Sequence, residues 1–420
     1  MATSPTAVRP PSYVPAVAIT VGLFFLWGMA NNLNDILIAQ FRKAFVLSDF
    51  GTSFVQQVFY LGYFLFAIPA SLLMSAKGYK AAIVTGLVLY GCGALLFYPA
   101  AAASQYLLFL LALFVIASGL AFLETSANPL MTELGDPAGA ARRINWAQAV
   151  NPLGAITGIL VGRNFILSGI QHDEASLGAM SAAQRLAYYQ MEVRAVVPPY
   201  LAIGVVVLTF ALTAALVRFP AGETSHREAV GLNGLSAAFR RPRLLAAAGA
   251  QLLYVGAQVG LWSYTIRYAQ SNVPGMGERA AADALFASLV LFSLGRFVGT
   301  VAMSRIRPAT LLAGFAAASL ALALTAALMG GTAGLYALVA ASFFMSIQFP
   351  TIFALGVEGL GPLRRAGASL IIMAIIGGAV LTAIMGWLSD RTSIATAMLV
   401  PAAAFAFIVT FALSARKGAA

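Results

Sequence analysis

Two carboxylates stand inside long apolar stretches of this sequence, where ionised side chains are rare. Asp35 closes the segment Asn31-Asn32-Leu33-Asn34-Asp35, and Glu124 lies between Leu123 and Thr125. If such a stretch crosses a membrane, an ionised and unpaired carboxylate costs several kcal/mol, so the residue is either protonated or retained for a function. A buried carboxyl group that gains and loses a proton is the chemistry that a proton-coupled carrier needs.

Each carboxylate also has a structural interpretation. Asp35 could end a helix that faces the outside water, although Ile36-Leu37-Ile38 continues the apolar run. Glu124 could be a protonated residue with a purely structural role, since its own run holds no basic residue that would neutralise it. We predict that both carboxylates take part in proton coupling.

Amide and aromatic side chains recur at three- and four-residue steps, which is the spacing of one helix face. Amides can bond to sugar hydroxyls while an aromatic ring covers a C–H surface, so these faces suit a neutral polyol. Polar side chains also join helices to one another inside membranes, and that alternative stays open for any single amide. The faces are Trp27, Asn31, Asn34 and Asp35; Glu124 and Asn128; Asn145, Gln148 and Asn151; and Gln251, Tyr254, Gln258 and Trp262.

Other motifs indicate structure rather than chemistry. Gly154, Gly158 and Gly162 repeat every four residues and predict a close-packing helix face. The lone Arg296 is expected to be structural, either near a helix end or paired. The sequence shows no metal-ligand cluster, phosphate-binding loop or nucleophile–base arrangement. We therefore expect no enzyme, no metal site and no cofactor other than the coupling proton.

Composition excludes a soluble protein. Of 420 residues, 60% are hydrophobic and 9% are charged, with a mean hydropathy of +0.87, whereas soluble domains are about 25% charged. The net charge of +11 could suggest a nucleic-acid partner, but Lys and Arg stand in short clusters between apolar runs, as membrane loops require. We predict that a lipid bilayer surrounds the chain and that it binds no nucleic acid.

Twelve apolar runs approach or exceed the about 20 residues that a bilayer span needs. They fall at roughly 14–38, 50–75, 81–100, 106–134, 143–170, 196–218, 244–270, 280–303, 309–330, 332–357, 366–388 and 394–414. We predict an all-α membrane protein of twelve transmembrane helices, with an N-terminal half at 1–218, a hinge loop at 219–243 and a C-terminal half at 244–420. The first run is predicted to be a retained span, because no small-residue cleavage site follows it.

The distribution of basic residues predicts the orientation. With alternating sides, 16 Lys and Arg residues fall on one side and 8 on the other, while Arg296 stays inside a span. The side richer in basic residues faces the cytoplasm. Both termini and the hinge are therefore predicted to be cytoplasmic, in a cell inner membrane.

The two halves repeat one motif. Asn128-Pro129 matches Phe349-Pro350, and each is followed by an arginine pair, Arg142-Arg143 and Arg364-Arg365. Duplicated six-span halves around a site at the membrane midplane are typical of transporters. We expect a monomer whose site lies between the halves.

Five segments carry a family resemblance: Phe24 to Leu37, Leu123 to Pro129, Asn145 to Asn151, Tyr254 to Tyr268 and Met345 to Phe353. They resemble the fucose/glucose/galactose branch of the major facilitator superfamily, and within it the L-fucose–proton symporters. The resemblance covers nearly the whole chain. It implies the major facilitator fold, alternating access by two six-helix halves about a central sugar site, and import driven by the proton gradient.

The resemblance also implies residue roles. The functional carboxylates of the family match Asp35 and Glu124, and its span-five sugar-binding asparagine matches Asn151. Phe349 stands where the symporters have tyrosine, so one possible sugar hydrogen bond is missing. The loop from Ser75 to Lys80 carries less charge than the superfamily pattern, so its gating contacts are expected to differ. The predicted proton-coupling residues are Glu124 and Asp35, and the predicted substrate-binding residues are Asp35, Glu124, Asn151, Asn31, Asn32, Gln148, Gln258, Trp262, Trp27 and Gln348.

We predict a proton-coupled importer of a neutral monosaccharide, L-fucose first. Glucose/galactose members of the branch tend to carry Gln where this chain has Glu124 and to lack Trp262-Ser263-Tyr264, which favours L-fucose. Three alternatives stay open: a glucose/galactose transporter, which could use sodium, a drug–proton antiporter, and a non-transporting sugar receptor. The amide faces count against the antiporter, and the lack of an appended soluble domain counts against the receptor.

Overall fold

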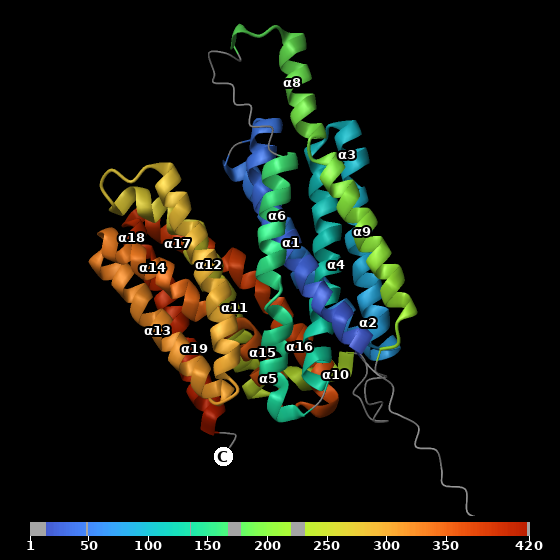
Figure 1. Ribbon diagram of the computed structural model, residues 1–420, viewed down its shortest axis with the longest axis vertical. Helices are drawn as coiled ribbons and strands as arrows, with labels where there is room; N and C mark the ends of the chain where they lie inside the picture. The colour runs from blue at the N-terminus through green and yellow to red at the C-terminus, as the bar shows by residue number, and fades with distance from the viewer. Residues whose placement is uncertain (1–13, 48, 135, 167–177, 220–231, 418–420) are drawn as a thin grey trace, which may run out of the picture.

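The computed structural model describes residues 14–47, 49–134, 136–166, 178–219 and 232–417, and every regular element in that part of the chain is a helix (Figure 1). The first elements are α1 (Val14–Ala44), α2 (Asp49–Leu95), α3 (Phe97–Ala103), α4 (Tyr106–Glu133), η1 (Pro137–Gly139), α5 (Ala140–Gln148), α6 (Asn151–Val161), η2 (Gly162–Ile166), α8 (Ala182–Arg194) and α9 (Val197–Leu216). The later ones are α10 (Leu232–Phe239), α11 (Pro242–Asn272), α12 (Glu278–Ala302), α13 (Pro308–Met329), α14 (Gly331–Met345), α15 (Gln348–Val357), η3 (Gly361–Leu363), α16 (Arg364–Met373), η4 (Ala374–Ile376), α17 (Gly377–Arg391), α18 (Ile394–Ala397) and α19 (Leu399–Lys417). The predicted all-α class is confirmed.

Ten helical segments among the described residues are long and apolar enough to cross a bilayer. One of them, Phe54–Ala103, has 50 residues, which would make about 75 Å of straight helix against a bilayer core of about 30 Å. It turns back at Gly78, whose φ of 82° is easily reached only by glycine. Gly62 before the turn and Gly86 after it therefore both lie against neighbouring turns of α4. This hairpin crosses the membrane twice.

A broken helix makes the crossing between α4 and α9. Its pieces α5, α6 and η2 have 9, 11 and 5 residues, so each one is too short to span a bilayer alone. They follow one another from Ala140 to Ile166 and run side by side with α1 and α4. With the hairpin counted twice and the broken helix once, the described helices account for the twelve predicted spans.

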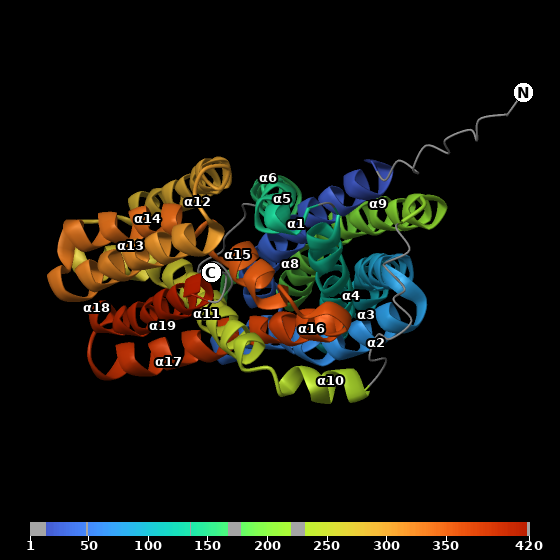
Figure 2. The same cartoon turned by 90° about the horizontal axis from the view of Figure 1, so that it is seen from below.

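The helices gather in two groups, α1–α9 and α11–α19 (Figure 1). From below, α15 and α16 lie between the groups, where they contact α2, α4 and α5 (Figure 2). Helix α1 begins and α19 ends at the same, lower end of Figure 1. Residues 220–231 of the predicted hinge lie outside the described part, and the remainder contains α10, which contacts α11 and α16. The exact boundaries of the halves stay a prediction.

Two prolines explain two helix breaks. Proline has no backbone N–H, so a proline in a helix leaves the carbonyl four residues earlier without its usual donor. Pro152 stands just after the break between α5 and α6, and Pro350 just after the break between α14 and α15. The carbonyl groups released in this way are those of Gln148 and Ser346. Both breaks lie beside the cavity described below.

Candidate functional site

A cavity of about 220 Å³ lies between the two groups of helices. Residues of α1, α2, α5 and α6 form one wall, and residues of α11, α12, α15 and η4 form the other. The surface inside is mixed, with amides, hydroxyls and indoles set among aliphatic and phenyl side chains. A space of this kind suits a small polar molecule with some apolar surface.

Seven of the ten predicted binding residues line this cavity, namely Trp27, Asn31, Asn32, Gln148, Asn151, Gln258 and Trp262. Glu124 and Gln348 are buried but are not among the lining residues. The Gln348 amide donates to the Ser319 hydroxyl and to the Phe344 carbonyl, both at 3.0 Å. Asp35 belongs to α1, but its side chain lies outside the part that the structure describes. Helical spacing therefore identified most of the residues that line the cavity. For the two carboxylates, the structure gives the helix that carries each one but does not place either in the cavity lining.

Close contact between α1 and α6 holds the amides of the first wall. Asn151 donates its side-chain N–H to the Phe24 carbonyl at 3.1 Å, and Asn32 donates to the Gly28 carbonyl at 3.0 Å. A Cβ on Gly154 would lie 2.0 Å from the Phe25 carbonyl oxygen, so only glycine allows this approach. The other two glycines of the repeat also face α1. The predicted close-packing face is confirmed.

Aromatic side chains build much of the second wall. The Trp262 indole donates to the Ser342 hydroxyl at 3.1 Å, and its ring lies edge-on to Phe292 with centroids 5.0 Å apart. Phe349 meets Trp27 of the other group, with ring centroids 5.9 Å apart. An aromatic pair therefore bridges the two groups beside the cavity.

Several lining residues were not predicted from the sequence. Gln56, Tyr60 and Tyr63 come from α2 at steps of four and three residues, so their shared face was readable from spacing alone. Arg296 also lines the cavity. It is 3% exposed, and in the described part of the chain none of the ion pairs includes it. Its expected position near a helix end or in a pair is wrong, since it lies inside α12 and bonds to neutral groups.

The neutral groups around Arg296 belong to both helix groups. Its Nε donates to the Ser346 carbonyl at 2.6 Å, and its Nη1 donates to the Gln148 backbone carbonyl at 3.2 Å and side-chain oxygen at 3.3 Å. The Phe292 ring lies 4.8 Å from the guanidinium carbon. Gln148 passes the contact on by donating to the Asn128 side-chain oxygen at 2.9 Å. A polar chain thus runs from the break after α14 through α12 and α5 to α4.

Glu124 lies on α4 one helical turn before Asn128 and is buried, and neither carboxyl oxygen has a hydrogen-bond partner among the described residues. The Tyr63 hydroxyl and the Trp27 indole N–H are also buried, and in the described part of the chain neither forms a hydrogen bond. Tyr63 is close enough to interact electrostatically with the Glu124 carboxyl and with the Trp27 side chain. Tyr63 lines the cavity, whereas Glu124 does not. A buried polar group without a partner costs about 1–3 kcal/mol, so these side chains favour any arrangement that gives them one.

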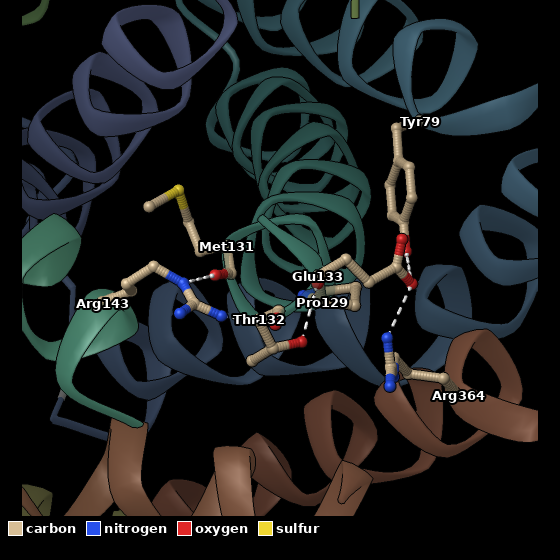
Figure 3. A network of polar contacts seen from close by, with 7 residues as sticks. All are labelled: Tyr79, Pro129, Met131, Thr132, Glu133, Arg143 and Arg364. Atoms are coloured by element: carbon tan, nitrogen blue, oxygen red, sulfur yellow. Dashed lines mark hydrogen bonds and ion pairs between the residues drawn. The ribbon is translucent and has the colours of Figure 1, made fainter. Parts of the chain in front are cut away.

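The lower end of the molecule is closed by a separate polar network (Figure 3). The Tyr79 hydroxyl donates to the Glu133 carboxylate at 2.5 Å, and Arg364 of the other group reaches the same carboxylate at 3.4 Å. Arg365 places its guanidinium carbon 5.0 Å from the Tyr79 ring centre and donates to the Met74 carbonyl at 3.2 Å. These contacts tie α16 to α2 and α4.

The two arginine pairs of the sequence repeat behave differently. Arg143 donates to the Met131 and Thr132 carbonyls at 3.3 and 2.9 Å, so it caps the end of its own neighbour α4 (Figure 3). Arg364 and Arg365 instead cross to the other helix group. The expectation that the gating contacts of the loop from Ser75 to Lys80 differ from the superfamily pattern stays a prediction, and Tyr79 of that loop takes part in the network.

Comparison with known proteins places the chain among transporters. The sequence model of the Major Facilitator Superfamily matches residues 19–378. The chain is 46% identical to the L-fucose-proton symporter of Escherichia coli K12 over 407 residues, which cover 96% of this chain and 93% of that one. It is 33% identical to the glucose/galactose transporter of Brucella abortus, over 94% and 92% of the two chains. The crystal structure of the transporter FucP in the outward conformation superposes with a TM-score of 0.88 at 45% identity, covering 96% of this chain and 99% of that one.

Proposed function

The chain belongs to the major facilitator superfamily, and on this premise we propose that it imports L-fucose together with a proton by alternating access. The relatives at 46% and 34% identity are L-fucose-proton symporters of Escherichia coli and Haemophilus influenzae. The observation that carries the proposal is the cavity, where amides and indoles from both helix groups surround one space beside the buried Glu124. The chain is a transporter and not an enzyme.

The sugar binds between the two walls of the cavity. Amides of Asn31, Asn32 and Asn151 on one wall and Gln258 on the other offer donors and acceptors to its hydroxyls. The indole rings of Trp27 and Trp262 cover its C–H and methyl surfaces. The amides that already bond to backbone keep one oxygen free for the ligand, so little rearrangement is needed on binding.

The proton binds at Glu124. It comes from a hydronium ion in the cavity: Tyr63 donates its hydroxyl proton to the ionised carboxylate and takes one from the hydronium. The hydronium becomes water, Tyr63 is unchanged, and Glu124 becomes a neutral acid. Neutralising the buried charge lowers the cost of closing the cavity around it. Asp35, by its place on α1, shares in coupling or contacts the sugar.

Rocking of the halves, residues 1–218 against 244–420, then exposes the cavity to the other side. The network of Tyr79, Glu133 and Arg364 closes the lower end, which supports an outward-open state like that of the FucP crystal structure. The excess of basic residues assigns this end to the cytoplasm, with both termini there. The protein acts as a monomer in the inner membrane.

Addition of sugar to lightly buffered, de-energised cells that produce the protein tests this function. We expect L-fucose to make the medium more alkaline as protons enter with the sugar, and Glu124→Gln to abolish the change. Alkalinisation by D-galactose or D-glucose alone would keep proton coupling and replace the substrate. Uptake that requires sodium and leaves the pH unchanged would overturn the coupling.

A further inference from the structure

Arg296 has a place that neither sugar binding nor proton coupling explains. It is buried and lines the cavity, and among the described residues its cationic group meets carbonyl oxygens and a phenyl ring but no carboxylate. Burying an arginine without an anion is unfavourable, and a neutral sugar gains little from a full charge. We therefore look to the groups that the Arg296 side chain contacts to explain why a charged residue stands at this position.

For two of these contacts, the sequence explains why the acceptor lacks a helical donor. Pro152 leaves the Gln148 carbonyl without a helical donor, and Pro350 does the same for the Ser346 carbonyl. Arg296 donates to both carbonyls, at 3.2 and 2.6 Å. Guanidinium suits this task, because its fixed fork carries five N–H groups and stays charged. One side chain thus satisfies two helix breaks that lie on opposite sides of the cavity.

The two bonds differ in what they join. Ser346 and Arg296 lie in the same helix group, so the bond between them fixes the arginine in place. Gln148 lies in the other group, and both of its oxygens accept from Nη1. When the lower end opens, α5 must separate from α12, and the Gln148 bonds must break. The guanidinium group then loses both Gln148 acceptors and keeps the Ser346 carbonyl.

We propose that Arg296 is a positioning residue that clasps the broken helices α5 and α14 together and thereby holds the cavity closed toward the lower end. The clasp also fixes Gln148, whose amide bonds to Asn128 one turn from Glu124. Sugar that competes for the Gln148 side chain weakens the clasp, which links binding to opening. This link rests on the proposed function, whereas the clasp itself does not.

Distances between spin labels test the clasp in the purified full-length protein without sugar. Labels go on cysteines at Arg142 of α5 and Arg305 after α12, both exposed, in a chain whose only other cysteine, Cys92, is changed to serine. Arg296→Lys keeps the charge but cannot reach both carbonyls. We expect the population with the longer distance to rise at least about tenfold relative to the unsubstituted chain.

Arg267→Lys is the matched control, because Arg267 is exposed and stacks on Tyr264 away from the cavity. Pro152→Ala is the second variant, which keeps Arg296 and returns a helical donor to the Gln148 carbonyl. We expect Pro152→Ala to shift the distances in the same direction, so it tests the clasp even where the lysine variant does not fold.

Unchanged distances in a folded variant would overturn the clasp. If L-fucose binding then fell, measured by tryptophan fluorescence, Arg296 would instead be a sugar contact. A wrong substrate leaves the distance measurement unaffected, so failure of the clasp and failure of the proposed function are distinguishable.

Discussion

Replacing Tyr63 by phenylalanine removes one hydroxyl from the wall of the cavity. The ring keeps its packing against Phe59, whose centroid lies 5.7 Å away, so the fold should be preserved. The hydroxyl forms no hydrogen bond with the residues that the structure describes, and we expect it to donate to Glu124 once that carboxyl is ionised. The variant therefore makes the ionised form of Glu124 less stable and leaves the stability of the neutral form almost unchanged.

The size of the effect follows from the bond that is lost. A hydrogen bond to a charged group contributes about 1.5–3 kcal/mol, and about 1.4 kcal/mol corresponds to one pH unit. The carboxyl of the variant holds its proton more tightly, so a higher pH is needed to remove it. We expect the pH midpoint of sugar efflux to rise by about 1–2 units.

Efflux and exchange of labelled L-fucose from proteoliposomes measure this directly. Net efflux requires loss of the proton in each cycle, whereas sugar exchange does not, so exchange should stay within about twofold of the unsubstituted rate. Tyr90→Phe is the control, since Tyr90 is equally buried but donates to the Leu26 carbonyl, at 3.4 Å. An unchanged midpoint, or an equal loss of efflux and exchange, would refute the role of Tyr63.

Two further predictions concern packing and gating. Gly154→Ala places a methyl group against the Phe25 carbonyl of α1. It should lower the free energy of unfolding by about 1–3 kcal/mol, which a lower melting temperature in detergent would show. Gly314→Ala is the control and should leave the melting temperature unchanged, because its methyl group meets no atom within 4 Å. An equal effect of both variants would contradict the close contact of α1 with α6. Glu133→Gln removes the ion pair to Arg364, which at a partly exposed site is worth up to about 1 kcal/mol. The labelled pair at residues 142 and 305 should then report up to about five times more of the open lower end, whereas a shorter distance or no change would argue against the lock.

Much of the fold could be predicted from the apolar runs. A bilayer core holds no water, so a single spanning segment must form its own backbone hydrogen bonds, and a helix does this. The helix breaks before α6 and α15 were not predicted. Hydropathy is continuous across both breaks, and a hydropathy value does not register that proline has no backbone N–H. Pro152 and Pro350 were visible in the sequence, but which donor would replace the lost helical one depends on α12, far away along the chain.

The site shows the same division between local and distant information. Trp27, Gln148 and Gln258 were found because helical spacing puts polar residues on one face. Tyr63 was missed although the same spacing places Gln56 and Tyr60 on its helix face. The contacts of Arg296 could not be predicted, because its partners come from α5 and α14 and are backbone groups.

The most direct test of proton-coupled import is sugar accumulation in proteoliposomes under an imposed pH gradient, compared between the unsubstituted chain and Glu124→Gln. The proposed function predicts that the unsubstituted chain concentrates L-fucose, while Glu124→Gln equilibrates it without concentrating it and still exchanges it. Glu358→Gln, which alters only the exposed pair with Arg243, should behave as the unsubstituted chain. Accumulation by Glu124→Gln at the normal rate would contradict the proton role of Glu124.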